Sequence, residues 1–341
     1  MSAVKLNILR IAFPLVEISR DLSEMSAWIE VGPARSMPQL SSKPGAGVIP
    51  ASAWSYEMGV TRTGSNVERR FVTTPLGRIH VAMAGTGFPV LLLHQTPRSW
   101  DEYRDVLPPL GRDFRAIAMD TPGFGDSDSP AGDPSIELWA EGAFALLDAL
   151  EEPRAAIVGH HTGAVIAVEM AASAPARVSV LVLSACPFVD AARRAKHQGM
   201  RVIDDVEARS DGAHLAELWA RRQPFYPADD IDLLQRFMID ALRAGEMAAE
   251  GHRVVNRYRM EDRIGQIHCP TLIIAPTGDP HVHPVAPKVA GAIEGSILRE
   301  LSGGMVPLPD QMPEAFAGLV RDFVDAQTAK IQMAKTQTAK I

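Results

Sequence analysis

The sequence predicts an α/β fold: a mostly parallel sheet flanked by helices, with an additional helical insertion. Two observations predict it. Short apolar runs alternate with helical segments along most of the chain, as expected where buried parallel strands are covered on both faces. Segment 187–264 breaks this alternation, because it is rich in Arg, Asp, Glu, Ala and Leu and has no strand-like run. We expect this segment to be all helical and to lie over one end of the sheet as a lid.

The apolar runs and their spacing place the elements in chain order. Segment 1–66, rich in Pro, Ser and Gly, is expected to be a poorly ordered N-terminal extension. The core is predicted to comprise 67–186 and 265–326, around the lid at 187–264. The C-terminal tail, 327–341, contains a repeated Gln-Thr-Ala-Lys-Ile and is expected to be dispensable.

Within the core, seven runs have the pattern of strands and four segments have helical spacing. The expected strands are 69–74, 78–84, 89–93, 114–119, 155–158, 178–183 and 272–275. The expected helices are 99–110, 137–150, 164–174 and 314–324.

The composition excludes several classes of protein. The 341 residues are 46% hydrophobic, which is enough for one large core. The net charge of −7, without a basic cluster, argues against nucleic-acid binding. No run reaches the roughly 18 apolar residues of a membrane span, and the N-terminus lacks a clear secretory signal. Two distant cysteines fit a reducing compartment, so we predict a cytoplasmic protein and leave its oligomeric state open.

Three loops follow predicted strands, at the sheet edge where ligands bind in open α/β folds. The first, Gly159-His160-His161-Thr162-Gly163, joins a strand to a helix. Glycines four residues apart permit the sharp turn of a nucleophile elbow, Gly-x-Ser-x-Gly, but His161 occupies the central position. The other two are His94-Gln95-Thr96-Pro97, where a backbone N–H can help to form an oxyanion hole, and the turn from Asp120 to Ser127.

From about Arg69 to Val324 the chain resembles the α/β-hydrolase superfamily. The similarity is greatest to its lidded branch of epoxide hydrolases, haloalkane dehalogenases and carbon–carbon bond hydrolases. The segment His94 to Pro97 corresponds to the His-Gly-x-Pro motif of that branch, and Asp120 to Ser127 matches Asp-x-x-Gly-x-Gly-x-Ser. The resemblance implies an α/β-hydrolase fold with an eight-stranded sheet.

The resemblance also implies roles for individual residues. Asp279 matches the catalytic acid, and the N–H groups of Thr96 and Thr162 match the oxyanion donors. The base histidine should follow Gly303-Gly304, where this chain has Met305. Since methionine cannot accept a proton, the ordinary Ser-His-Asp mechanism cannot operate.

His161 is therefore the candidate catalytic residue, as a base or a nucleophile, with Asp279 orienting it if their loops approach. The alternative is a polar side chain in a site that has lost its chemistry. Gln95, Trp100, His160 and Met305 are candidates for substrate binding, although His160 also suits packing beside the sheet and Trp100 suits the core. The acidic residues of the insertion, Asp204 among them, are expected to form a solvated face.

Several histidines near Asp279 permit a metal site, but no metal-binding motif supports one, so we predict neither a metal nor a cofactor. The function predicted is hydrolysis of a small, mainly apolar organic substrate by water that His161 activates. The alternative is a catalytically silent relative that binds a ligand or a partner. The superfamily also contains lyases and oxygenases, so the reaction class rests on resemblance.

Overall fold

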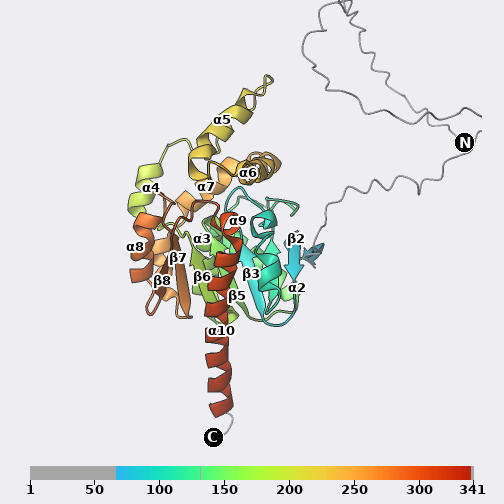
Figure 1. The fold of residues 1–341 in the computed structure, drawn as a ribbon, viewed down its shortest axis with the longest axis vertical. Coiled ribbons are helices and arrows are strands. Elements are labelled where there is room, and N and C mark those ends of the chain that lie inside the picture. The colour runs from blue at the N-terminus through green and yellow to red at the C-terminus, as the bar shows by residue number, and fades with distance from the viewer. Residues whose placement is uncertain (1–66, 131, 339–341) are drawn as a thin grey trace, which may run out of the picture. The chain divides into compact units, whose positions relative to one another are not determined.

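The computed structural model describes residues 67–130 and 132–338 (Figure 1). The predicted N-terminal extension therefore lies outside the described residues. Among the helices described, none has the length and apolar character required to cross a bilayer.

An eight-stranded sheet forms the centre of the described region, in the order β1-β2-β4-β3-β5-β6-β7-β8. The β1–β2 and β2–β4 pairs are antiparallel, and the other neighbours are parallel. The strands are β1 Glu68–Thr74, β2 Gly77–Ala84, β3 Pro89–Leu93, β4 Arg115–Met119, β5 Ala155–His160, β6 Val178–Ser184, β7 Thr271–Pro276 and β8 Ile297–Leu301. The predicted mostly parallel eight-stranded sheet is confirmed.

Helices cover both faces of the sheet, because the central strands are buried on both sides. Helices α2, α3 and α8 pack on one face, and α1, α9 and α10 pack on the other. Their bounds are α1 Leu107–Leu110, α2 Ile136–Ala149, α3 Thr162–Ser173, α8 Ala286–Gly291, α9 Leu308–Gln311 and α10 Pro313–Thr338. Successive apolar residues of each central strand point to opposite faces of the sheet, so the strands contribute to two separate cores.

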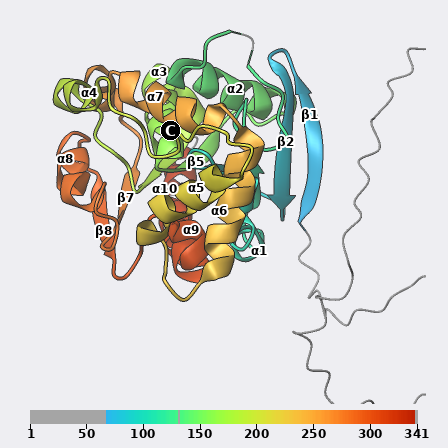
Figure 2. The same cartoon turned by 90° about the horizontal axis from the view of Figure 1, so that it is seen from above.

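Between β6 and β7 the chain leaves the sheet for a helical insertion that lies over one end of it (Figures 1 and 2). The insertion contains α4 Ala191–His197, α5 Ala213–Arg222, α6 Ile231–Ala244 and α7 Met247–Arg257. Helix α6 has a small core of its own around Phe237. Helix α7 instead packs on the main core through Val254 and Val255.

Two predicted helices differ from the structure. The helix expected over 99–110 is wrong: a short 3-10 turn, Trp100–Tyr103, is followed by α1. Pro108 and Pro109 have no N–H to donate to the carbonyls four residues earlier, so a continuous helix cannot form. The helix expected over 314–324 is instead α10, which continues through the predicted tail to Thr338 and extends beyond the sheet (Figure 1).

Candidate functional site

The turn between β5 and α3 has the geometry of a nucleophile elbow. His161 is the residue before α3 and has φ +47° and ψ −109°, a backbone conformation that non-glycine residues rarely adopt. A Cβ at Gly159 would lie 2.2 Å from the carbonyl oxygen of Gly163, and one at Gly163 would lie 1.9 Å from that of Leu93. The two glycines are therefore required for the close approach that places His161 at the tip of the turn.

His161 forms a direct pair with the predicted acid. Its Nε2 lies 2.7 Å from Oδ2 of Asp279, which follows β7. The carboxylate is fully buried, whereas the His161 side chain remains 16% exposed. Burial acts to raise the pKa of Asp279, but the His161 ring and the N–H of His281 have a larger effect in the opposite direction. The pKa of Asp279 therefore lies below the ordinary carboxyl value.

The pairing also sets the tautomer of His161. An ionised carboxylate only accepts hydrogen bonds, so Nε2 carries the proton and donates it to Asp279. Within the described residues, Nδ1 of His161 has no hydrogen-bond partner. The structure therefore holds one imidazole nitrogen by an acid and leaves the other available as an acceptor.

His160 is held in the interior, where its side chain is fully buried. Its Nε2–H donates to the carbonyl of Val306 at 2.8 Å, and its Nδ1 lies 3.0 Å from Oγ of Ser184. Burial and the neighbouring His161 hold the pKa of His160 well below its ordinary value. This neutral ring braces the elbow against the loop before α9, the packing role that we considered for it from the sequence.

Beside the elbow, the loop after β3 contains Thr96, whose N–H is one of the two predicted oxyanion donors. The N–H of Gln95 is already bonded to Glu102, at 2.8 Å, and the Gln95 side chain donates to the same carboxyl at 2.6 Å. The N–H groups of Thr96 and Thr162, in contrast, have no acceptor within the part of the chain that the structure describes. The Thr96 hydroxyl is also buried without a partner there. Unpaired donors at this edge are suited to an anionic oxygen.

His94 and Asp120, which belong to the two other motifs, form hydrogen bonds that hold the loops in place. His94 donates from Nδ1 to the Gln95 carbonyl and accepts the N–H of Thr121 at Nε2. Asp120 accepts the N–H groups of Trp100 and Asp126. A Cβ at Gly125, which has φ +55°, would lie 2.2 Å from the Asp120 carboxyl. The Asp120–Ser127 motif is thus a tightly folded turn whose carboxylate ties the neighbouring segments together.

Met305 lies near the loop that carries Asp279. The Gly278 N–H donates to the Gly304 carbonyl at 2.7 Å, and a Cβ at Gly278 would meet Met305 Cγ at 3.2 Å. No imidazole is present at position 305 to bind the acid. Asp279 reaches the ring of His161 instead.

A cavity of about 400 Å³ lies over His161 and is bounded by the helical insertion. Gln95, Thr96 and Thr162 line it from the core, together with His281 from the loop after Asp279. Arg193 and Arg222 line it from the insertion, where Lys196 and Arg201 also contribute. None of its described lining residues is acidic. The lining also includes apolar side chains, among them Pro187, Met200 and Val306, so the cavity combines cationic and apolar surface.

Of the predicted substrate-binding residues, Gln95 lines the cavity, whereas Trp100, His160 and Met305 are not among its lining residues. The Trp100 ring faces the guanidinium of Arg69 and lies beside His80, on the side of β1 and β2. His80, Asp120 and Asp126 also form a group whose potential metal-ligand atoms lie within 4.8 Å of one another. Asp120 and His80 bond to each other at 2.8 Å, and Asp126 pairs with Arg243, so protein contacts already account for these side chains.

The insertion contributes residues that the sequence analysis missed. We expected Asp204 to be solvated, but it is 4% exposed and accepts from Arg222 Nε at 2.6 Å and from His252 Nε2 at 2.8 Å. These ion pairs lower the pKa of Asp204 to about 2, although burial acts in the opposite direction. The helical spacing of the insertion gives no signal for these contacts, since the partners lie 18 and 48 residues apart.

The comparisons with known proteins agree with this fold. A family model described as alpha/beta hydrolase fold matches residues 89–293, more than half of the chain, so the protein belongs to this family. Over 90 residues it is 37% identical to the soluble epoxide hydrolase of Corynebacterium sp. (strain C12), covering 26% of this chain and 32% of that one. Over 130 residues it is 33% identical to 2-hydroxymuconate semialdehyde hydrolase of Pseudomonas sp. (strain CF600), covering 37% and 46%.

These matches span less than half of either relative. Among solved structures, the chain resembles the enol-lactonase of Burkholderia xenovorans LB400 with a TM-score of 0.63 and 19% identity, over 75% of this chain and 100% of that one. At this identity the likeness shows the fold alone. The predicted resemblance to the α/β-hydrolase superfamily is confirmed.

Proposed function

We propose that this protein is a hydrolase of a small organic molecule and that His161 is its general base. The observation that carries this proposal is the 2.7 Å pair of His161 and Asp279 at the tip of a strained turn, beneath a cavity. Strained backbone persists where the surrounding structure enforces it, and it clusters at active sites. The printed names of the sequence relatives, an epoxide hydrolase and a semialdehyde hydrolase, support hydrolysis as the reaction.

In the proposed reaction a water molecule attacks the electrophilic carbon of the substrate. Nδ1 of His161 accepts the proton of that water while Nε2–H remains bonded to Asp279, whose negative charge stabilises the imidazolium. The N–H groups of Thr96 and Thr162 donate to the oxygen on which negative charge develops. The imidazolium then returns its proton to the leaving group, which completes the addition of water across the broken bond.

The insertion acts as a lid in this proposal. It closes the cavity above His161 and limits the access of bulk water, which strengthens electrostatic interactions inside. Gln95, fixed by Glu102, lies in the cavity wall and is a candidate hydrogen-bonding partner for the substrate.

A panel of nitrophenyl esters and epoxides tests the proposal with the wild type, His161→Ala and His268→Ala. His268 is exposed and precedes β7, so its variant controls for the loss of a histidine elsewhere. We expect His161→Ala to lower kcat by about 100-fold or more, within the range that general base catalysis contributes, and His268→Ala to retain wild-type activity. Wild-type activity that survives in His161→Ala would remove His161 from the mechanism. A wild type inactive on the whole panel would favour the catalytically silent ligand-binding alternative.

A further inference from the structure

We propose that the substrate is an organic anion whose carboxylate, or another oxyanion group, binds Arg193 in the cavity above His161. This inference rests on the proposed function, because it names the substrate class of the same site. Its basis is the charge of the cavity wall, which differs from the charge of the chain as a whole.

The cavity wall is cationic although the protein is acidic overall. The chain has 41 Asp and Glu against 34 Lys and Arg. The cavity wall nevertheless contains Arg193, Lys196, Arg201 and Arg222, with no described acidic residue among those that line it. A concave surface of one sign concentrates ligands of the opposite sign.

Arg193 is a cation of the cavity wall whose side chain is bonded to a neutral partner. It is half-buried on α4, and its Nε donates to Oδ1 of Asn256 at 3.2 Å, so the guanidinium is held by a neutral group. Within the described residues its side chain forms no ion pair: the nearby Asp190 bonds to the Arg193 backbone N–H and to Lys288 instead. Burial lowers the pKa of Arg193, because it outweighs the opposing attraction of the nearby Cys186 and Asp190.

Arg222 provides an internal comparison in the same cavity. Its guanidinium is paired with the buried Asp204, which also accepts from His252. Since Asp204 supplies a negative charge behind the wall, Arg222 is compensated within the protein. Lys196, three residues after Arg193 on α4, has no ion pair among the described residues, so α4 brings two uncompensated positive charges to the cavity.

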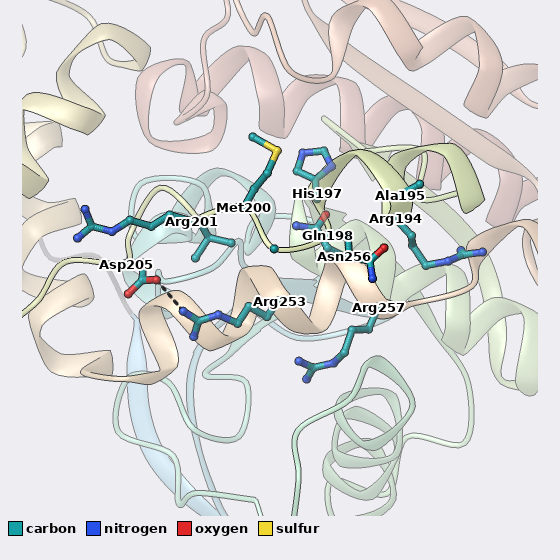
Figure 3. Close-up of a pocket in the computed structure, with 12 residues that line it drawn as sticks. Arg194, Ala195, His197, Gln198, Met200, Arg201, Asp205, Arg253, Asn256 and Arg257 are labelled. Atoms are coloured by element: carbon teal, nitrogen blue, oxygen red, sulfur yellow. Dashed lines mark hydrogen bonds and ion pairs between the residues drawn. The ribbon is translucent and has the colours of Figure 1, made fainter.

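In an adjoining groove of the insertion, the arginines are paired with acidic residues. This groove, of about 870 Å³, lies between α4 and α7 (Figure 3). It shares five lining residues with the cavity, namely His197, Met200, Arg201, Val202 and Asn256. Its arginines have acidic partners: Arg253 pairs with Asp205 at 2.8 Å (Figure 3), and Arg257 pairs with Glu250 at 2.7 Å. Unpaired cations are thus found on the side that faces His161. A carboxylate or phosphate group matches the fork of a guanidinium.

Direct binding tests the inference without requiring turnover. Glutarate and its neutral diamide, glutaramide, are titrated into the wild type, Arg193→Gln and Arg259→Gln by calorimetry. Arg259 is an exposed arginine that pairs with Asp262 outside the cavity, so it is a matched control. We expect glutarate to bind at least tenfold more tightly than glutaramide. Arg193→Gln should weaken glutarate binding at least tenfold, and Arg259→Gln should leave it unchanged. Lys196→Met, a second variant of α4, should weaken it severalfold.

Ester hydrolysis then identifies the anion. The esters are mono-4-nitrophenyl glutarate, its neutral methyl ester, and the phosphonate of matched length. We expect kcat/KM for one charged ester to exceed that for the neutral ester at least tenfold, and either preference supports the inference. Equal binding of glutaramide and glutarate, or glutarate binding that neither α4 variant weakens, overturns it. Glutarate binding by a protein that hydrolyses no ester would retain the anion site and remove the proposed hydrolase.

Discussion

At the scale of single residues, two departures from the family pattern accompany a different partner for the predicted catalytic acid. Where the family pattern places a base histidine, this chain has Met305, and where it places a nucleophile the chain has His161. Asp279 bonds to the imidazole at the elbow itself. The proposed site is therefore a two-residue dyad in which the nitrogen facing away from the acid is the one that acts.

Asp279→Asn should abolish most activity without removing the contact. An asparagine amide can donate to Nε2 of His161, which leaves the proton on Nδ1 and blocks that nitrogen from accepting one. We expect kcat to fall by about 100-fold or more at pH 7, measured on the best ester of the panel. Asp262→Asn, at an exposed acid, is the control. Activity of Asp279→Asn within threefold of the wild type would contradict the dyad.

At the scale of elements, a buried ion cluster joins the insertion to the core. Arg98 lies in the loop after β3, and its Nε donates to Asp240 of α6 at 2.8 Å. Arg98 also contacts Asp310 of α9, which pairs with Arg236 of α6 at 2.8 Å. Because these contacts connect α6 with the loops beside Thr96, the insertion and the site are held in one arrangement.

Glu102, which lies beside this cluster, should make stability depend on pH. Burial raises the pKa of Glu102 from the ordinary value of 4.5 to about 8, against the attraction of Arg98. Between these values the folded state binds more protons than the unfolded state, so the free energy of unfolding falls as pH rises. From pH 6.5 to 8 we expect Glu102 to contribute a loss of up to about 2 kcal/mol, from about 1.4 kcal/mol per pH unit.

Glu102→Gln should reduce that slope, because glutamine does not ionise and its amide can still pair with Gln95. Urea unfolding followed by tryptophan fluorescence at several pH values measures the difference. The window begins at 6.5, the ordinary pKa of His94 and His160, whose lowered pKa values make stability rise with pH near that value in both proteins. The difference in slope between wild type and variant therefore reports on Glu102. Equal slopes for wild type and variant would contradict the assignment to Glu102.

The close contact of α7 with the loop after β3 gives a second prediction at this scale. A Cβ at Gly251 would lie 2.5 Å from Thr96 Cγ2 and 3.0 Å from Phe124. Gly251→Ala should therefore displace Thr96 and reduce kcat about tenfold or more. The gain of about 1 kcal/mol in helix propensity should offset part of the loss of stability from overpacking. Gly265→Ala, whose Cβ would meet nothing within 4 Å, is the control, and equal activity of the two variants would argue against this contact.

At the scale of the whole molecule, two cores on opposite faces of the sheet determine which segments are needed. Helix α10 contributes Phe316, Val320 and Val324 to one of these cores, and all three lie before the predicted tail. The C-terminal part of α10 extends beyond the sheet (Figure 1). The stability of the fold should therefore depend on the first half of this helix.

Deletion of residues 327–341 should leave the melting temperature within about 3 °C of the wild type and leave activity unchanged. Phe316→Ala in the full chain, in contrast, should lower the free energy of unfolding by about 3–5 kcal/mol, because it empties a buried site. Calorimetry and the ester assay measure both. A large loss of stability on truncation would show that the tail segment makes contacts on which the fold depends.

The elements of the fold differ in how well the sequence predicted them. Apolar runs located seven strands, since strands buried on both faces need continuous apolar residues. The eighth, Ile297–Leu301, is partly exposed along its length and has no such run, so only the family resemblance predicted it. The helix expected over 99–110 was wrong because apolar spacing outweighed the effect of the adjacent prolines in our interpretation.

The amino-acid sequence by itself determined the α/β fold, the elbow at Gly159–Gly163 and the loss of the base at Met305. Each of these depends on local patterns, namely apolar period, glycine spacing and residue identity at a motif position. Only the tertiary structure decided that Asp279 reaches His161, that His160 is buried, and that Arg193 and Arg222 line one cavity. These facts depend on contacts between segments that are distant in sequence; His161 and Asp279, for example, are 118 residues apart. Local sequence patterns do not predict such contacts.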